Sequence, residues 1–167
     1  MAVNPAEDIV NVWLQDKGYF TQQNITVPKA KGNKGKEIDI LAINIKGDKI
    51  WVEVTVSPRP RRQKANEQIS YAIKTVKNKF HIEKENKVRE IFKSKKFRKM
   101  FVYTSTIFSY PDEKVPIFSK KVSLKKIEVV NFKDVFNETV GNINHYSVDP
   151  IKIQLYYIQR LYENAKK

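Results

Sequence analysis

The chain has 167 residues, of which 41% are hydrophobic, so its length and composition indicate one globular domain rather than a disordered chain. Cysteine is absent, which excludes disulfides and thiolate metal sites, and no apolar run is long enough to cross a membrane. The 32 Lys and Arg residues against 18 Asp and Glu residues give a formal net charge of +14. This excess favours a polyanionic partner, above all nucleic acid, although a solvated lysine-rich surface is the simpler alternative.

The first ten residues, MAVNPAEDIV, include an acidic pair where a signal peptide would need basic and then apolar residues. Together with the lack of cysteine, this favours a cytoplasmic location. The first expected element is a helix that begins at Asn4 as N-cap, with Pro5 in its first turn and Glu7 three residues after the cap. Gly18 is expected to end it. Spacing places Glu7 on the inward side, and a capping bond back to Asn4 is its alternative role.

Three strands are expected next, at 19–27 and at two runs within 36–57, after a lysine-rich loop at 29–36. In the third strand, alternation places Glu53 and Thr55 on one face and an all-aliphatic row on the other. The aliphatic face is predicted to be the core, so Glu53 faces whatever covers the second side of the sheet. The segment 57–62 then interrupts the sheet with two prolines and three arginines.

The rest of the chain alternates between helical and strand patterns. Helices are expected at 63–80, 83–95, 134–140 and 150–166, strands at 100–104 and 127–132, and a loop at 110–121 that contains Pro111 and Pro116. Counting the main elements gives the order α-β-β-β-α-β-β-α, which predicts an α/β fold with a central mixed β-sheet flanked by helices. Residues 1–167 are read as one domain, with 149–167 as a C-terminal helix whose apolar stripe packs on the core or, alternatively, forms a dimer interface.

Two carboxylates stand among aliphatic residues in the second and third strands. Asp39 and Glu53 would both be strongly unfavourable if buried as isolated charges. A two-residue turn at Gly47-Asp48 would send Asp39 into the core, whereas an odd-length connection or a bulge would pair it with Thr55 or Ser57, diagonal to Glu53. The odd-length connection is preferred because it brings both acids to one patch.

Two carboxylates in one patch repel each other unless one is protonated or a cation lies between them. Oxygen ligands of this kind suit Mg²⁺ or Mn²⁺, which commonly bind a substrate phosphate as well. In a chain with a charge of +14, the expected phosphate is that of a nucleic acid. Charge and acid pair together therefore favour phosphodiester hydrolysis, in which the metal activates water and neutralises charge on the phosphate.

The pattern of Glu7 on an opening helix, Asp39 beginning one strand and Glu53-Val54-Thr55 on the next resembles the PD-(D/E)XK nuclease superfamily. Over residues 6–106 the order of elements is most similar to archaeal Holliday-junction resolvases and restriction-endonuclease-like domains. The resemblance implies a restriction-endonuclease-like core and a DNA endonuclease in which Asp39, Glu53 and the Val54 carbonyl bind the metal. Glu7 would bind it directly or through water, and DNA substrates that need two cuts would imply a homodimer.

One residue departs from the superfamily pattern, because Thr55 stands where a lysine is expected two residues after the second acid. A threonine hydroxyl can orient water but supplies no positive charge. Three explanations stay open: Lys64 or Lys36 reaches in from another element, a second metal replaces the ammonium, or the chain is a nucleic-acid-binding domain or subunit without catalysis. The resemblance also implies that the helix after the third strand lends a polar residue, either Gln68 or Lys64. An RNA endonuclease with the same site is a further alternative.

The sequence also predicts where the nucleic acid binds. Basic residues close to the acid-bearing strands are expected to contact its phosphates, and these are Lys36, Arg59, Arg61, Arg62 and Lys64. A solvated loop is the alternative role for the three arginines.

Overall fold

The computed structural model describes residues 4–28, 36–55, 67–105, 108, 111–141 and 149–164. Its helices are α1 (Pro5–Asp16), α2 (Gln68–Lys79), α3 (Ile82–Phe92), α4 (Pro111–Ser123), α5 (Phe132–Gly141) and α6 (Pro150–Asn164). Its strands are β1 (Tyr19–Val27), β2 (Lys36–Asn44), β3 (Lys49–Thr55), β4 (Arg98–Tyr103) and β5 (Ile127–Asn131). Within the part of the chain that the structure describes, no helix is both long and apolar enough to span a membrane.

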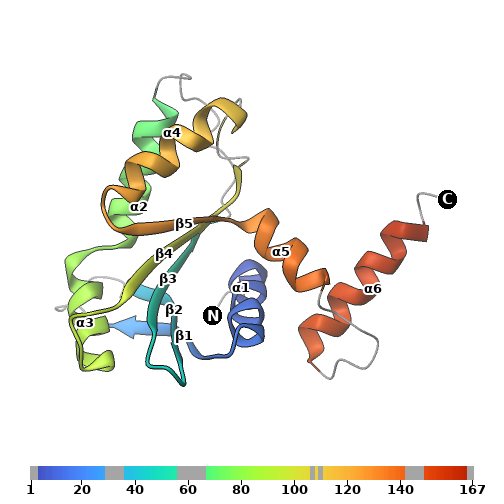
Figure 1. Cartoon of the computed structure of the whole chain (residues 1–167), viewed down its shortest axis with the longest axis horizontal. Coiled ribbons are helices and arrows are strands. Elements are labelled where there is room, and N and C mark those ends of the chain that lie inside the picture. The colour runs from blue at the N-terminus through green and yellow to red at the C-terminus, as the bar shows by residue number, and fades with distance from the viewer. Residues whose placement is uncertain are drawn as a thin grey trace.

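The five strands form one sheet in the order β1-β2-β3-β4-β5 (Figure 1). The first three strands pair antiparallel, and β3, β4 and β5 pair parallel. The parallel connections run through helices, as parallel strands require. Helices α1 and α5 lie on one side of the sheet, and α2, α3 and α4 lie on the other (Figure 1). The predicted α/β class with a mixed sheet flanked by helices is confirmed.

Both faces of β3 are buried, as the predicted alternation requires. The aliphatic face, with Ile50, Val52 and Val54, packs against Val10 and Leu14 of α1. The opposite face carries Trp51 and Glu53, and α2 and α3 cover this face. Glu53 therefore sits inside the protein although it faces away from the aliphatic core.

The β2–β3 hairpin has the odd-length connection that the sequence predicts. Ile43 pairs with Lys49, and Asn44 N–H donates to the Asp48 carbonyl at 3.1 Å, which leaves three residues at the tip. Gly47 adopts φ +82°, the left-handed conformation that such a three-residue loop needs. The pairing of β2 with β3 runs only as far as Ile40 and Val52.

Two expectations about secondary structure are wrong. The segment expected to be a loop at 110–121 is helix α4, because Phe118 and Val122 lie one turn apart and are fully buried, and this burial offsets the cost of Pro116 inside the helix. The order α-β-β-β-α-β-β-α is incomplete as well. The structure has α-β-β-β-α-α-β-α-β-α-α, which adds the unexpected helix α4 and includes α3 and α5, the helices expected at 83–95 and 134–140 that the short order left out.

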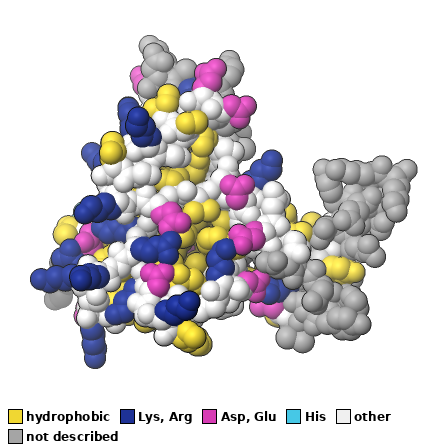
Figure 2. All heavy atoms as spheres, viewed as in Figure 1, with side chains coloured by type: hydrophobic (Ala, Val, Ile, Leu, Met, Phe, Trp, Pro, Cys, Tyr) yellow, Lys and Arg dark blue, Asp and Glu magenta, His cyan; other side chains and the backbone are white. Residues whose placement is uncertain are grey.

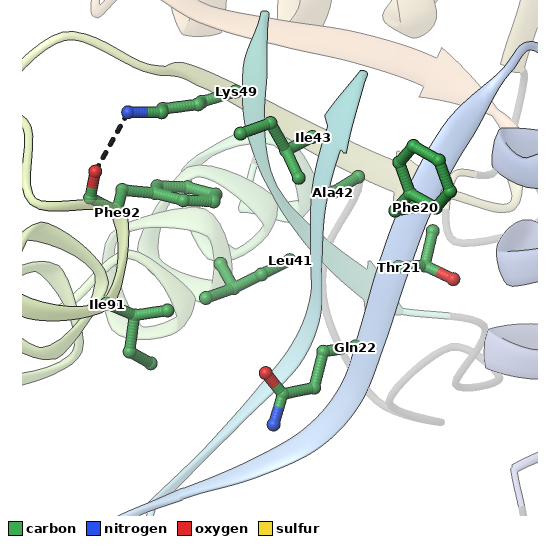
Figure 3. Close-up of a pocket in the computed structure, with 9 residues that line it drawn as sticks. All are labelled: Phe20, Thr21, Gln22, Leu41, Ala42, Ile43, Lys49, Ile91 and Phe92. Atoms are coloured by element: carbon green, nitrogen blue, oxygen red, sulfur yellow. Dashed lines mark hydrogen bonds between the residues drawn. The ribbon is translucent and has the colours of Figure 1, made fainter. Parts of the chain in front are cut away.

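An apolar hollow of about 330 Å³ lies between the β1–β2 surface and α3 (Figure 3). Phe20, Leu41, Ile91 and Phe92 are among its lining residues, and Lys49 Nζ closes one side by donating to the Phe92 carbonyl at 2.8 Å. None of the residues lining it is an acid. The hollow therefore cannot provide the acid chemistry that the sequence predicts.

Candidate functional site

Asp39 lies where the regular alternation of β2 breaks. Ile38 and Leu41 are three residues apart, yet both belong to the hydrophobic cluster that packs against α3. Ile40, which lies between them, belongs to the hydrophobic cluster that packs against α1. The pairing of β1 with β2 also omits Asp39 and its opposite residue Asn24, whose φ is +54°. These observations place an irregularity in the β1–β2 pairing at Asp39.

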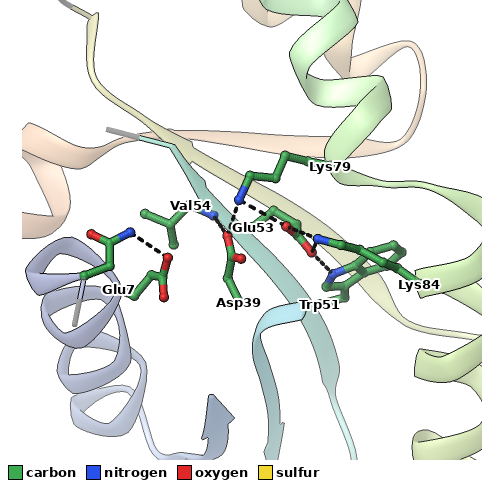
Figure 4. A network of polar contacts seen from close by, with 8 residues as sticks. Glu7, Asp39, Trp51, Glu53, Val54, Lys79 and Lys84 are labelled. Carbon is green, nitrogen blue, oxygen red and sulfur yellow. Dashed lines mark hydrogen bonds and ion pairs between the residues drawn. The ribbon is translucent and has the colours of Figure 1, made fainter. Parts of the chain in front are cut away.

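The Asp39 carboxylate replaces a missing backbone hydrogen bond between β2 and β3. Its Oδ2 accepts the Val54 N–H at 2.8 Å, just past the last paired residues Ile40 and Val52 (Figure 4). The same oxygen accepts from Lys79 Nζ at 2.7 Å. Asp39 precedes Ile40 and Glu53 follows Val52, and Ile40 pairs with Val52, so the two acids are neighbours across the strands. The predicted pairing of Asp39 with Thr55 or Ser57 is therefore wrong.

The Glu53 carboxylate accepts more hydrogen bonds than the carboxylates of Asp39 and Glu7. Lys84 Nζ donates to both of its carboxylate oxygens at 2.8 and 2.7 Å, and Trp51 Nε1 donates to Oε1 at 2.8 Å. Lys79 Nζ stands 3.5 Å from Oε2, so its ammonium lies between the carboxylates of Asp39 and Glu53 (Figure 4). The side chain of Glu53 is 0% exposed. Ammonium groups are thus what make the two buried acids tolerable in this structure.

Burial is the main influence on the ionisation of this cluster. It raises the pKa of Glu53 to about 7, helped by the nearby Asp39 carboxylate, and the ammonium groups of Lys84 and Lys79 only partly offset this. Burial alone would lower the pKa of Lys79, but the carboxylates of Asp39 and Glu53 outweigh burial and raise it. Lys79 is therefore a fixed positive charge at neutral pH.

Glu7 approaches this cluster from α1, on the opposite side of Asp39 from Lys79 (Figure 4). Its Oε1 accepts from Asn4 Nδ2 at 2.6 Å, and Asn4 in turn caps the helix by accepting the Ala6 N–H at 3.2 Å. Burial and then the Asp39 charge raise the pKa of Glu7. Glu7 therefore contacts the capping residue Asn4, as its alternative role predicts, and its carboxylate also interacts electrostatically with Asp39.

The two lysines of the site were not among the candidates from the sequence. Lys79 is the last residue of α2, and Lys84 belongs to the first turn of α3. Each continues the buried stripe of its helix, Lys79 after Ala72 and Val76, and Lys84 one turn before Val88. A lysine on the inward stripe of an amphipathic helix was the signal that could have identified them.

The Thr55 hydroxyl ends the same face of β3, two residues after Glu53. Its Oγ1 is buried and has no hydrogen-bond partner among the described residues. Buried hydroxyls are nearly always satisfied, so this atom has capacity for a further hydrogen bond.

The remaining candidates lie elsewhere or outside the described residues. Gln68 begins α2, about 16 Å from Lys79 by helical rise, and its Oε1 accepts from Lys114 of α4 at 3.3 Å, so the prediction that it joins the acids is wrong. Lys36 is also not a replacement for the motif lysine, because its Nζ contacts Glu83 at 3.0 Å and His81 at 3.1 Å. Outside the described residues lie Arg59, Arg61, Arg62 and Lys64.

Carboxylate oxygens from three elements suit a hard divalent cation by their chemistry. Their present spacing, however, is set by ammonium groups, because Lys79 Nζ fills the place between Asp39 and Glu53. Among the residues that can be placed, no three His, Cys, Asp or Glu side chains are grouped closely enough to hold a metal ion. The donor set therefore fits such an ion only if Lys79 withdraws from between the acids.

The raised pKa of Glu53 predicts how stability depends on pH without metal. Between about 4.5 and about 7 the folded chain keeps a proton that the unfolded chain loses. The free energy of unfolding should therefore fall by about 3 kcal/mol as the pH rises through this window, and then stay level. Urea unfolding in EDTA at pH 5 to 8, with Glu53→Gln for comparison, tests this. An equal pH dependence in both proteins would contradict it.

Comparisons with known proteins place the chain in no family. No family model matches it, and no curated protein matches it significantly. Among solved structures it is similar to the crystal structure of the protein of unknown function AF1548, with 16% sequence identity and a TM-score of 0.42. That match covers 78% of this chain and 59% of the other protein.

Proposed function

We propose that this chain is a divalent-metal-dependent endonuclease that hydrolyses phosphodiester bonds in DNA. The observation that carries the proposal is the Lys79 ammonium between Asp39 and Glu53, with Glu7 close to Asp39. Carboxylates together with one lysine are the groups that metal-assisted phosphodiester hydrolysis uses. The formal charge of +14 supplies the attraction for a polyanionic substrate.

Lys79 takes the role of the lysine that Thr55 replaces. Because the acids raise its pKa, it stays protonated at neutral pH and acts as a charge stabiliser rather than as a general base. Its side chain is 28% exposed, so it can turn from Asp39 towards an incoming phosphate. Lys84, which is almost fully buried, keeps Glu53 in position while Lys79 moves.

Asp39 and Glu53, with Glu7 and the Val54 carbonyl, would hold Mg²⁺ or Mn²⁺ once Lys79 withdraws. Such an ion neutralises charge on the scissile phosphate and activates water. Asp39 keeps its position through the Val54 N–H. The unpartnered Thr55 hydroxyl would orient the attacking water. Substrates that need two cuts would require a homodimer.

A second candidate function is a nucleic-acid-binding domain of the same fold without catalysis. It is favoured by the complete burial of Glu53 and by the ammonium groups that contact both of its oxygens. In that case Lys79 and Lys84 serve only to neutralise buried acids. Nucleic-acid binding would then persist in any variant that lacks one of these acids or lysines and still folds.

One experiment separates the two functions. Purified protein is incubated with supercoiled, linear, single-stranded and four-way-junction DNA in Mg²⁺, Mn²⁺ or EDTA. The endonuclease proposal expects metal-dependent cleavage of at least one of these substrates and none in EDTA. Binding to all four substrates without cleavage under any condition would replace it with the binding domain.

A further inference from the structure

A group of exposed lysines gathers where α2 packs beside α4 (Figure 1). Helix α2 contains no acid, and neither does the segment 119–127, which ends α4 and leads into β5. Together they form what we call the α2–α4 lysine patch, which consists of Lys74, Lys77, Lys120, Lys121, Lys125 and Lys126. In Figure 2 separate basic side chains lie along the left edge of the region that α2 and α4 occupy.

Within the part of the chain that the structure describes, the charges of the patch are not compensated by paired acids. Some cations elsewhere pair with acids, as in Lys17 with Glu138 and Lys99 with Glu85, while exposed lysines such as Lys96 have no ion pair among the described residues. None of the six patch lysines lies within ion-pair distance of a carboxylate among the residues that the structure describes. The patch is therefore a described surface on which six exposed cations gather without paired acids.

Two members of the patch crowd each other. The pKa of Lys125, although its side chain is exposed, is lowered by slight desolvation and then by the neighbouring Lys77 ammonium. Like charges at such proximity are unfavourable unless an anion lies between them. Tyr71, one turn before Lys74, is 44% exposed and adds an aromatic surface that bases can stack on. The one large exposed aliphatic side chain in the segment, Leu124, is too little for insertion into a membrane.

We propose that the α2–α4 lysine patch binds the phosphate backbone of the nucleic acid, at a surface separate from the acid cluster. The proposal rests on the proposed function for the class of ligand. Lys77 and Lys79 share the last turn of α2, with Lys79 directed at the acids and Lys77 exposed on the patch. The patch and the proposed catalytic lysine therefore meet at the C-terminal end of one helix, on different sides of it.

The test compares two double variants with the same net charge. Lys77→Gln/Lys125→Gln removes the centre of the patch, whereas Lys46→Gln/Lys96→Gln removes two exposed lysines outside it. Binding to a short DNA duplex is measured in EDTA, where no cleavage occurs, over a range of salt concentrations. The patch variant should lose roughly tenfold in affinity, and its plot of log affinity against log salt should flatten by about 2, one unit for each lost phosphate contact.

The control variant should bind nearly as the wild type does, and unfolding curves check that both variants are folded. Equal losses in the two variants, or a wild-type slope in the patch variant, would overturn the patch while leaving the proposed function standing. Failure of the wild type to bind DNA at low salt would overturn both. Anionic phospholipid vesicles serve as a second ligand, and loss of vesicle binding alone in the patch variant would assign the surface to membranes and overturn the proposal.

Discussion

Replacement of Lys79 by methionine should lower the rate of Mg²⁺-dependent DNA cleavage by about 10² to 10³. This is the typical loss when one preorganised donor to a developing charge is removed from a hydrolytic site. Methionine keeps the aliphatic stem and removes only the ammonium that lies 2.7 Å from Asp39. Single-turnover cleavage of labelled DNA, at protein concentrations that saturate binding, measures the effect on the chemical step.

Two controls give this result its meaning. Lys79→Arg retains the positive charge and should recover part of the rate, whereas Lys46→Met, at the β2–β3 turn, should leave the rate unchanged. DNA affinity should change little in Lys79→Met, because one partly buried ammonium adds little to a charge of +14. A folded Lys79→Met variant that cleaves at the wild-type rate would remove Lys79 from the mechanism.

Lys84→Met is expected to lower the free energy of unfolding by about 3 to 5 kcal/mol. The substitution leaves the fully buried Glu53 without the ammonium that contacts both of its oxygens. Breaking a buried ion pair on one side is costly because the other charge stays desolvated. The loss should be smaller at pH 5 than at pH 8, since Glu53 can then take up a proton. Urea unfolding at the two pH values measures both effects.

The double variant Glu53→Gln/Lys84→Met tests this explanation. It removes both charges of the buried pair, so its stability should return to within about 1 or 2 kcal/mol of the wild type. Recovery of this kind would identify Lys84 as the partner that keeps Glu53 in place. If the double variant is as unstable as Lys84→Met, the loss comes from packing around the lysine stem and not from the charge pair.

The sequence predicts much of the fold because its patterns report burial directly. Asn4 and Pro5 begin α1 where the capping pattern places its start, and Gly18 follows its end. Alternation in β3 predicted that its aliphatic face belongs to the core, and this face packs against α1. The odd-length turn followed from the cost of burying Asp39 among aliphatic side chains. These features are determined by residues that are close together in the sequence, so local sequence patterns are sufficient to predict them.

The features that were missed depend on contacts between distant segments. Lys79 and Lys84 are 40 and 31 residues from the acids they bind, and no local pattern joins them. Helix α4 was missed because Pro116 outweighs local helix propensity, and only burial of Phe118 against the sheet reverses this. The irregularity at Asp39 also involves its opposite residue Asn24 on β1.

The most direct test of the acid and lysine site is nicking of supercoiled plasmid by the wild type and by Asp39→Asn. Asparagine can still accept the Val54 N–H through its side-chain oxygen, so the substitution removes the charge and keeps the strand contact. We predict Mg²⁺-dependent nicking by the wild type and none by Asp39→Asn, with DNA affinity retained. Nicking by folded Asp39→Asn at the wild-type rate would show that the chemistry, if any, belongs to another part of the chain.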